Sequence, residues 1–231
     1  MEPIPLLNEI KAITFDLDDT LWHNPPVIQN AQSKIKQHLL DEFSGFNQNS
    51  LDDEFRESLI LVRAKNPKLA HNLTELRRQS FEVLLRNHGY DPKQSYDLME
   101  KFLKFRHEVS IYPDVEVCLQ HLNGKYKLAA LTNGNANVMR LEIGKYFDAH
   151  FSAEHVGVQK PKRRIFDHVS NALNMPHQNI LHVGDNPVDD VKGALDSGFQ
   201  AVWVNRSRIK WPLDLLGHKE IQDLCQLPKL V

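Results

Sequence analysis

Three carboxylates directly follow an apolar segment near the start of the chain. Residues 12–20 have the sequence AITFDLDDT, which places Asp16, Asp18 and Asp19 within four positions. Like charges at such short range raise one another's pKa unless a cation lies between them. Mg²⁺ would remove this cost, because it binds carboxylate and carbonyl oxygens together with waters and substrate phosphate. The alternative interpretation is a solvated acidic turn, since Asp is an ordinary turn residue.

Three further polar segments stand at the ends of predicted elements. They are Thr132-Asn133-Gly134-Asn135 after a predicted strand, Gly184-Asp185 with Asp189 and Asp190 after another, and Lys160 in the connection 157–161 before a predicted helix. In an open α/β sheet, ligands bind beyond the carboxyl ends of the strands, near the switch point. Each segment alone is also an ordinary turn or helix approach. Their joint occurrence in the appropriate places and order favours one common site.

Composition and charge exclude several other classes of protein. The 231 residues include 28 Lys and Arg and 30 Asp and Glu, which gives a net charge of −2. The chain thus lacks the excess of positive charge that is typical of proteins that bind nucleic acid or an anionic membrane. Cys118 and Cys225 form neither a disulfide framework nor a zinc motif. The first residues lack a signal-peptide pattern, and no apolar run is long enough to span a membrane. We therefore expect a cytoplasmic protein with a small-molecule partner and no nucleic-acid or membrane partner; its oligomeric state is left open.

Hydrophobic periodicity divides the chain into a helical part and an alternating part. Four amphipathic stretches between residues 27 and 109 predict four helices, the third ending at Gly89 and the fourth beginning at Asp91-Pro92. The predicted strands are 11–15, 127–131, a short one around Phe151, 180–183 and 201–204, and the predicted helices between them are 114–122, 138–143, 164–173 and 188–196. Alternation of this kind predicts an α/β fold whose parallel, Rossmann-like sheet is covered by helices on both faces. We predict a core domain over 1–22 and 108–231 and an inserted helical cap over 23–107.

The four polar segments together resemble the motifs of the haloacid-dehalogenase-like hydrolase superfamily. Its motifs are D-x-D followed by x-T or x-V, a Ser or Thr after the second strand, a Lys, and an acidic pair after Gly-Asp. The resemblance covers the whole chain, including the glycine-containing helix that follows the last motif. One departure is Lys160-Pro161-Lys162-Arg163, where the family often has a second proline; this concerns the start of the helix and not the chemistry.

The resemblance implies a role for each matching residue. Asp16 would be the nucleophile that forms an aspartyl-phosphate, and Asp18 the general acid and then the base. Thr132, the Asn133 backbone and Lys160 would hold the phosphoryl oxygens. The Mg²⁺ ligands would be Asp16, the Asp18 carbonyl and Asp185, with an outer carboxylate supplied by Asp189 or Asp190, of which we favour Asp190.

Asp18 also favours a phosphatase over a dehalogenase. The dehalogenases of this superfamily lack an acid at that position, because a halide leaves without a proton whereas an alkoxide needs one. The helical insert lies between the first two motifs, and only 27 positions separate Asn133 from Lys160. We therefore expect the insert to act as a lid that excludes water and contacts the leaving group; an added packing domain is the alternative.

Three stretches, 14–22, 131–136 and 181–185, resemble most closely the bacterial riboflavin-pathway pyrimidine phosphatases, which also hydrolyse flavin mononucleotide. The expected substrate is thus flavin mononucleotide or the ribitylamino-uracil phosphate. There are two alternatives to this function. The chain could be another sugar-phosphate or nucleotide phosphatase of the same superfamily, or a non-catalytic relative that binds a partner. Trp22 and His23 stand where the lid begins and could pack against a heteroaromatic leaving group, although Trp22 could equally be a packing residue at the hinge.

Overall fold

A single parallel sheet organises the larger part of the molecule, in a computed structural model that describes residues 9–214 and 217–231. Its six strands are β1 (Ala12–Phe15), β2 (Lys127–Thr132), β3 (Ala149–Ser152), β4 (Ile180–Gly184), β5 (Gln200–Val204) and β6 (Lys219–Ile221). They are ordered β3-β2-β1-β4-β5-β6, and every neighbouring pair is parallel. From β1 the chain continues to β2, which lies beside β1 at one of its edges. After β3 it returns to β4, which lies beside β1 at the opposite edge. The carboxyl end of β1 is therefore the switch point at which an open α/β sheet binds ligands.

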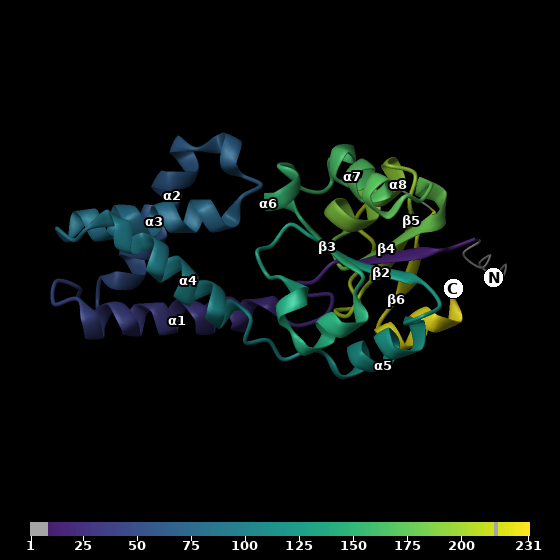
Figure 1. The fold of residues 1–231 in the computed structure, drawn as a ribbon, viewed down its shortest axis with the longest axis horizontal. Helices are drawn as coiled ribbons and strands as arrows, with labels where there is room; N and C mark the ends of the chain where they lie inside the picture. The colour runs from purple at the N-terminus through teal and green to yellow at the C-terminus, as the bar shows by residue number, and fades with distance from the viewer. Residues whose placement is uncertain (1–8, 215–216) are drawn as a thin grey trace. The chain divides into compact units, whose positions relative to one another are not determined.

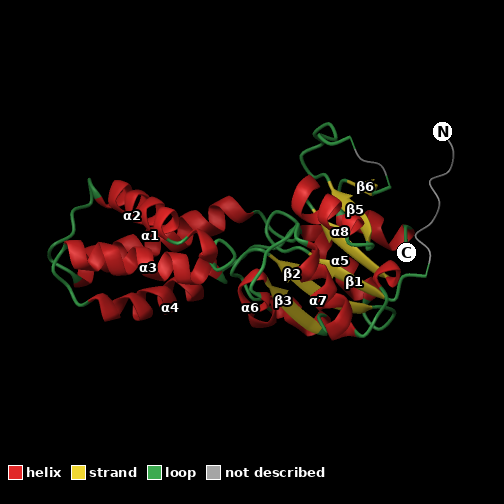
Figure 2. Ribbon diagram, turned by 90° about the horizontal axis from the view of Figure 1, so that it is seen from above, coloured by secondary structure: helices red, strands yellow, loops and turns green. Residues whose placement is uncertain are grey.

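Helices cover both faces of this sheet. In Figure 1, α7 (Arg163–Leu173) and α8 (Gly193–Asp196) lie on one side of the strands and α5 (Pro113–Leu122) on the other. Figure 2 shows the strands of the sheet from above. All four residues of β1 and all five of β4 are buried, as expected for strands with a helix layer on each face. The α/β class with a parallel, Rossmann-like core is thus confirmed.

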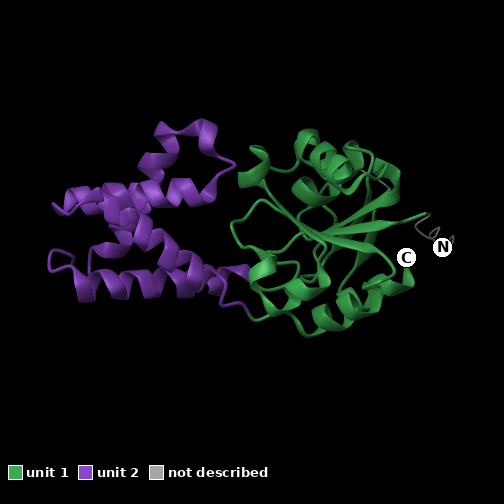
Figure 3. Cartoon of the chain, viewed as in Figure 1, with its two compact units in different colours: residues 1–23, 110–231 green, residues 24–109 purple. Residues whose placement is uncertain are grey.

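The described chain divides into two compact units, coloured separately in Figure 3. One comprises residues 1–23 and 110–231 and the other residues 24–109, whereas the sequence predicts boundaries after residues 22 and 107. The second unit contains α1 (Asn24–Glu42), α2 (Leu51–Lys65), α3 (Leu73–Asn87) and α4 (Ser95–Arg106). Its helices pack around an aromatic core that includes Phe55, Phe81 and Phe102. No helix among the described residues is long and apolar enough to cross a membrane.

Several elements differ from the sequence-based prediction. Asp91 does cap a helical turn by accepting from the backbone N–H of Lys93, but the turn is a 3₁₀ segment (Pro92–Gln94), and α4 begins at Ser95. The predicted helix 138–143 is wrong: two 3₁₀ segments, Val138–Arg140 and Glu142–Tyr146, occupy this region. The predicted helix 188–196 is a π-helical segment, Pro187–Lys192, followed by the single-turn α8. Strand β6 has no counterpart in the prediction.

Candidate functional site

Asp16 lies one residue beyond β1, at the switch point of the sheet. Its backbone N–H donates to the carbonyl of Val183 on β4 at 2.9 Å, which holds the residue in register with the neighbouring strand. The side chain is 11% exposed. Asp16 is therefore a nearly buried carboxylate at the carboxyl edge of the sheet.

Lys160 connects three of the predicted site segments through one buried ammonium group. Its Nζ donates to Asp16 Oδ1 at 2.7 Å, to Asp190 Oδ1 at 2.6 Å and to the carbonyl of Leu131 at 2.7 Å. The side chain is only 1% exposed. All three donor hydrogens of the ammonium group are thereby used. Burial alone would lower the pKa of Lys160, but the combined attraction of Asp16 and Asp190 raises it, so this group is a fixed cation.

The side chain of Asn133 fixes the loop that carries Lys160. Its Oδ1 accepts from the backbone N–H of Lys160 at 2.8 Å, and its Nδ2 donates to the Lys160 carbonyl at 3.1 Å and to Asp189 Oδ2 at 3.2 Å. Thr132 is buried at the end of β2, and its Oγ1 accepts from the backbone N–H of Gly134 at 2.9 Å. The structure thus places Thr132 and Asn133 at the same strand edge as Asp16.

Three carboxylates converge beside Lys160. One oxygen each of Asp16, Asp185 and Asp190 lies within 4.8 Å of the other two, a spacing that could hold a metal ion. Asp185 is positioned by Thr20, whose Oγ1 donates to its Oδ1 at 3.2 Å, and by the indole of Trp203, which donates to its carbonyl at 2.8 Å. Hard oxygen donors gathered in this way fit Mg²⁺. Asp189 is not a member of this group.

The carboxylates have strongly perturbed pKa values. Burial raises the pKa of Asp16 well above its ordinary value, despite the opposing effect of Lys160. Burial, followed by the nearby charges of Asp190 and Asp19, raises the pKa of Asp185 to about 7. Burial would also raise the pKa of Asp190, but Lys160 and then His182 outweigh it and lower that pKa. The cluster therefore holds more acidic groups than its single buried lysine neutralises, which favours binding of a further cation.

Gly184 makes room for Asp190. A Cβ atom on Gly184 would lie 2.3 Å from both Cγ and Oδ2 of Asp190, which is far inside van der Waals contact. The Asp190 carboxylate occupies the space that a side chain at the end of β4 would fill. The glycine of the Gly-Asp motif is thus required by this close approach.

The loop after Asp16 carries Asp18. Its Oδ1 accepts from the indole N–H of Trp22 at 2.9 Å, and Trp22 is fully buried. The structure therefore favours the interpretation of Trp22 as a packing residue over stacking on a ligand. Arg206 braces the same loop, because its Nη2 and Nε donate to the carbonyl of Thr20 at 2.9 and 3.2 Å.

Sequence reasoning did not identify Thr14, Thr20, His182 or Arg206. Thr20 lies within the first motif, at the position where the superfamily pattern has Thr or Val, and that match was the available signal. Arg206 lies in a short basic cluster with no motif, and Thr14 and His182 lie within apolar strand segments. Their contacts depend on which strands are neighbours, which no local pattern specifies.

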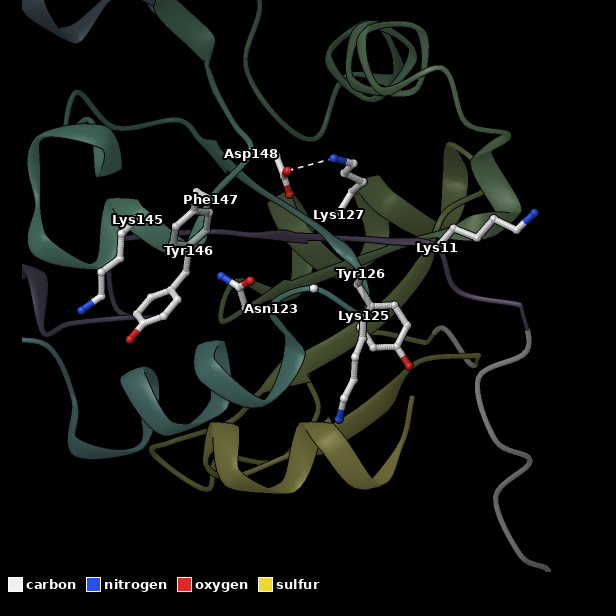
Figure 4. Close-up of a pocket in the computed structure, with 10 residues that line it drawn as sticks. Lys11, Asn123, Lys125, Tyr126, Lys127, Lys145, Tyr146, Phe147 and Asp148 are labelled. Carbon is white, nitrogen blue, oxygen red and sulfur yellow. Dashed lines mark hydrogen bonds and ion pairs between the residues drawn. The ribbon is translucent and has the colours of Figure 1, made fainter.

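A pocket of about 350 Å³ lies at the opposite edge of the sheet (Figure 4). Lys11 and Lys127, at the amino ends of β1 and β2, are among its lining residues, and Lys127 is paired with Asp148 at 3.0 Å. Asp16 and Thr132 stand at the carboxyl ends of the same two strands. The pocket is therefore separate from the carboxylate cluster.

Comparisons with known proteins find similar hydrolases over most of the chain. A family model described as haloacid dehalogenase-like hydrolase matches residues 10–198. The chain is 31% identical over 233 residues to the 5-amino-6-(5-phospho-D-ribitylamino)uracil phosphatase YigB of Escherichia coli K12, covering 97% of this chain and 98% of that protein. It is 28% identical to a phosphoserine phosphatase of Thermus thermophilus, covering 85% and 89% of the two chains. A solved structure described as 2-haloacid dehalogenase, from Pseudomonas syringae pv. Tomato, has a TM-score of 0.88 and 33% identity, covering 96% and 97% of the chains.

Proposed function

Since this chain belongs to the haloacid dehalogenase-like hydrolase family, we propose that it hydrolyses a small phosphate monoester with the help of Mg²⁺. Within the family it is a phosphoric monoester hydrolase, in keeping with the phosphatases to which it is similar. The observation that carries the proposal is the triple contact of Lys160 with Asp16, Asp190 and the Leu131 carbonyl, beside a cluster of three carboxylates. The proposal is supported because a carboxylate, a buried cation and a group of acidic side chains that could hold a metal ion lie together at one strand edge.

Asp16 is the nucleophile in this proposal. Lys160 occupies its Oδ1, so Oδ2 attacks phosphorus; the new Oδ2–P bond forms while the ester P–O bond breaks. Asp18 gives its proton to the departing alkoxide. It then takes a proton from the water that attacks phosphorus, and the Oδ2–P bond breaks to release inorganic phosphate.

The phosphoryl charge requires neutralisation at the same place. Asp16, Asp185 and Asp190 would hold Mg²⁺, with the Asp18 carbonyl as a further ligand, and the ion would neutralise charge on the transferring phosphoryl oxygens. Asp190 is the outer carboxylate, because Lys160 and the backbone N–H of Asn186 already occupy its oxygens. Thr132 and the backbone of Asn133 supply the remaining phosphoryl contacts.

A dehalogenase is the second candidate, because a structure with 33% identity is described as one. Asp18 argues against it here, since loss of a halide requires no proton whereas loss of an alkoxide does. The indole of Trp22 keeps the Asp18 carboxylate in a fixed position at the site loop. A non-catalytic role would not require all four of the residues Asp16, Asp18, Lys160 and Asp185.

For the substrate, we favour flavin mononucleotide or the ribitylamino-uracil phosphate of riboflavin biosynthesis. The similarity to the Escherichia coli uracil-derivative phosphatase extends over 97% of this chain and supports this choice. We further predict that the helical unit, residues 24–109, selects the leaving group. A lid of this kind contributes binding energy that can be expressed in the transition state.

The test is a substrate panel on the purified full chain, with and without Mg²⁺. We expect phosphate release from flavin mononucleotide with a higher kcat/KM than from glycerol phosphate or phosphoglycolate, and no chloride release from chloropropionate. Asp16→Asn should abolish turnover and keep the fold, with the surface variant Asp196→Asn as the control. Halide release without phosphate release would contradict the phosphatase, and a strong preference for phosphoglycolate would contradict only the substrate.

A further inference from the structure

Two polar side chains lie inside an otherwise apolar layer beneath the site. Thr14 on β1 and His182 on β4 are paired in register, and both are at most 1% exposed. The layer around them contains Ile180, Phe166 and Val191, and the ring of Phe166 meets that of His182 edge-on with 5.8 Å between centroids. Buried polar groups in such surroundings destabilise the fold unless they are hydrogen-bonded. Their hydrogen bonds therefore need a complete account.

The contacts of these two residues determine which ring nitrogen of His182 donates to Asp190. Thr14 Oγ1 lies 2.8 Å from His182 Nδ1 and 3.3 Å from the carbonyl of Leu181, while His182 Nε2 lies 3.1 Å from Asp190 Oδ1. A carboxylate cannot donate, so Nε2 must carry the proton shared with Asp190. The other ring nitrogen, Nδ1, is held by the Thr14 hydroxyl over the shorter of that hydroxyl's two contacts.

This arrangement determines how Asp190 can be oriented. Its Oδ1 accepts from both His182 Nε2 and Lys160 Nζ, and its Oδ2 accepts from the backbone N–H of Asn186 at 2.9 Å. Rotation of the carboxylate would break three bonds at once. The same Lys160 ammonium group contacts the Asp16 nucleophile at 2.7 Å.

We propose that Thr14 and His182 are positioning residues, which act through Asp190 to align Lys160 and the carboxylate cluster. This inference rests on the proposed function only because Lys160 and the carboxylates, which the pair aligns, are the proposed catalytic groups. Thr14 orients the imidazole, His182 holds Oδ1 of Asp190, and Asp190 holds the lysine that contacts Asp16. Neither Thr14 nor His182 contacts the substrate.

The surroundings indicate that the pair serves the site and not the fold. Replacing both partners of the Thr14–His182 hydrogen bond by apolar groups of similar shape leaves neither of these two positions with an unsatisfied polar group, and Asp190 then loses one donor but keeps Lys160. Apolar side chains at these two positions would extend the layer formed by Ile180, Phe166 and Val191. Folding stability and activity should therefore respond differently to their removal.

The first test measures the proton arrangement directly. In the full-length protein at neutral pH, nitrogen-15 NMR of the histidine rings should show that Nε2 of His182 carries a proton. Assignment comes from the signal lost in His182→Gln. An unprotonated Nε2 would overturn the proposal. This measurement needs neither substrate nor turnover, so it remains informative if the phosphatase assignment fails.

The second test separates positioning from folding. The double variant Thr14→Val with His182→Leu should still unfold in one cooperative transition, while its kcat falls roughly 10- to 100-fold and its KM hardly changes. Mg²⁺ affinity, measured by calorimetry without substrate, should fall by a similar factor because Asp190 loses a donor. Unchanged kcat and Mg²⁺ affinity in a folded double variant would refute the proposal.

Three single variants, His182→Gln, His182→Leu and Thr14→Val, keep this test decisive if the double variant folds poorly. His182→Gln keeps an N–H that can donate to Asp190 and should recover part of the kcat lost in His182→Leu. Thr14→Val is nearly isosteric and should lower kcat with KM unchanged. If His182→Gln were as impaired as His182→Leu, or if Thr14→Val had wild-type kcat, the positioning role would be wrong.

Discussion

Asp185 should destabilise the metal-free protein at alkaline pH and become favourable only when Mg²⁺ is bound. Burial, then the charges of Asp190 and Asp19, raise its pKa from 3.8 to about 7. Below pH 3.8 the carboxyl is protonated in the folded and unfolded states alike. As the pH rises from 3.8 to 7, the unfolded chain releases its proton first, so the folded state loses stability, and the loss is complete above pH 7.

The size of this loss follows from the two pKa values. The difference between 7 and 3.8, at 1.36 kcal/mol for each pH unit, corresponds to about 4 kcal/mol of unfolding free energy. For a chain of this length, each kcal/mol shifts Tm by roughly 2–4 °C. The penalty is therefore about 8–16 °C at about pH 8 and much smaller near pH 5.

Asp185→Asn tests this reasoning, because the amide keeps the oxygen that accepts from Thr20 and removes the charge. After treatment with a chelator, the variant should be more stable than the wild type at about pH 8, and the gap should narrow toward pH 5. Millimolar Mg²⁺ should reverse the order, because it binds the ionised cluster of the wild type and stabilises only the folded state.

Thermal unfolding followed by circular dichroism, at several pH values with and without Mg²⁺, provides the measurement. Asp196→Asn is the matched control, since Asp196 is an exposed carboxylate that pairs with Lys192 outside the cluster. If the wild type and Asp185→Asn had the same pH dependence without metal, the buried-charge argument would be refuted. If Mg²⁺ stabilised both equally, Asp185 would not be a ligand.

Three further predictions follow from the site. Gly184→Ala should lower kcat at least 10-fold in a phosphate-release assay, because its Cβ would displace the Asp190 carboxylate from a position 2.3 Å away; wild-type kcat would contradict the close approach. Lys160→Met should abolish turnover and lower the unfolding free energy of the metal-free protein by about 3–5 kcal/mol in denaturant titrations, since it removes the buried cation shared by Asp16 and Asp190; Mg²⁺ should restore part of that stability. Asp18→Asn should reduce kcat more for alkyl than for aryl phosphates, because aryl leaving groups need less protonation; equal losses would argue against Asp18 as the general acid.

Local sequence patterns were sufficient to predict the central strands and the end of one helix. The segments 11–15 and 180–183 are apolar runs of strand length, and both became central strands. Gly89 was predicted to end a helix because it tolerates positive φ, and its φ is 76°. Residues 138–146 and 187–192 form 3₁₀ and π-helical segments, because local hydrophobic spacing does not distinguish these turns from a short α-helix.

The sequence by itself determined which residues could do the chemistry. Asp16, Asp18, Lys160 and Asp185 are recognisable because their types and order suit phosphoryl transfer, and each stands at the end or start of a predictable element. Strand ends in a parallel sheet converge on one edge, so a common site was predictable without coordinates. The sequence could only favour Asp190 over Asp189 as the outer carboxylate. Both positions hold an aspartate, and they differ only in what surrounds each side chain in the folded chain.

Only the tertiary structure decided how these groups support one another. Lys160 meets Asp16 across 144 positions of sequence, and Thr14 meets His182 across 168, because β1 lies between β2 and β4 in the sheet. The side chain of Asn133 binds the Lys160 backbone, and the indole of Trp22 is buried against Asp18 instead of being available to a ligand. Hydrogen-bond partners and pKa shifts depend on distance, burial and neighbouring charge, and these quantities exist only once strand order has brought distant segments together.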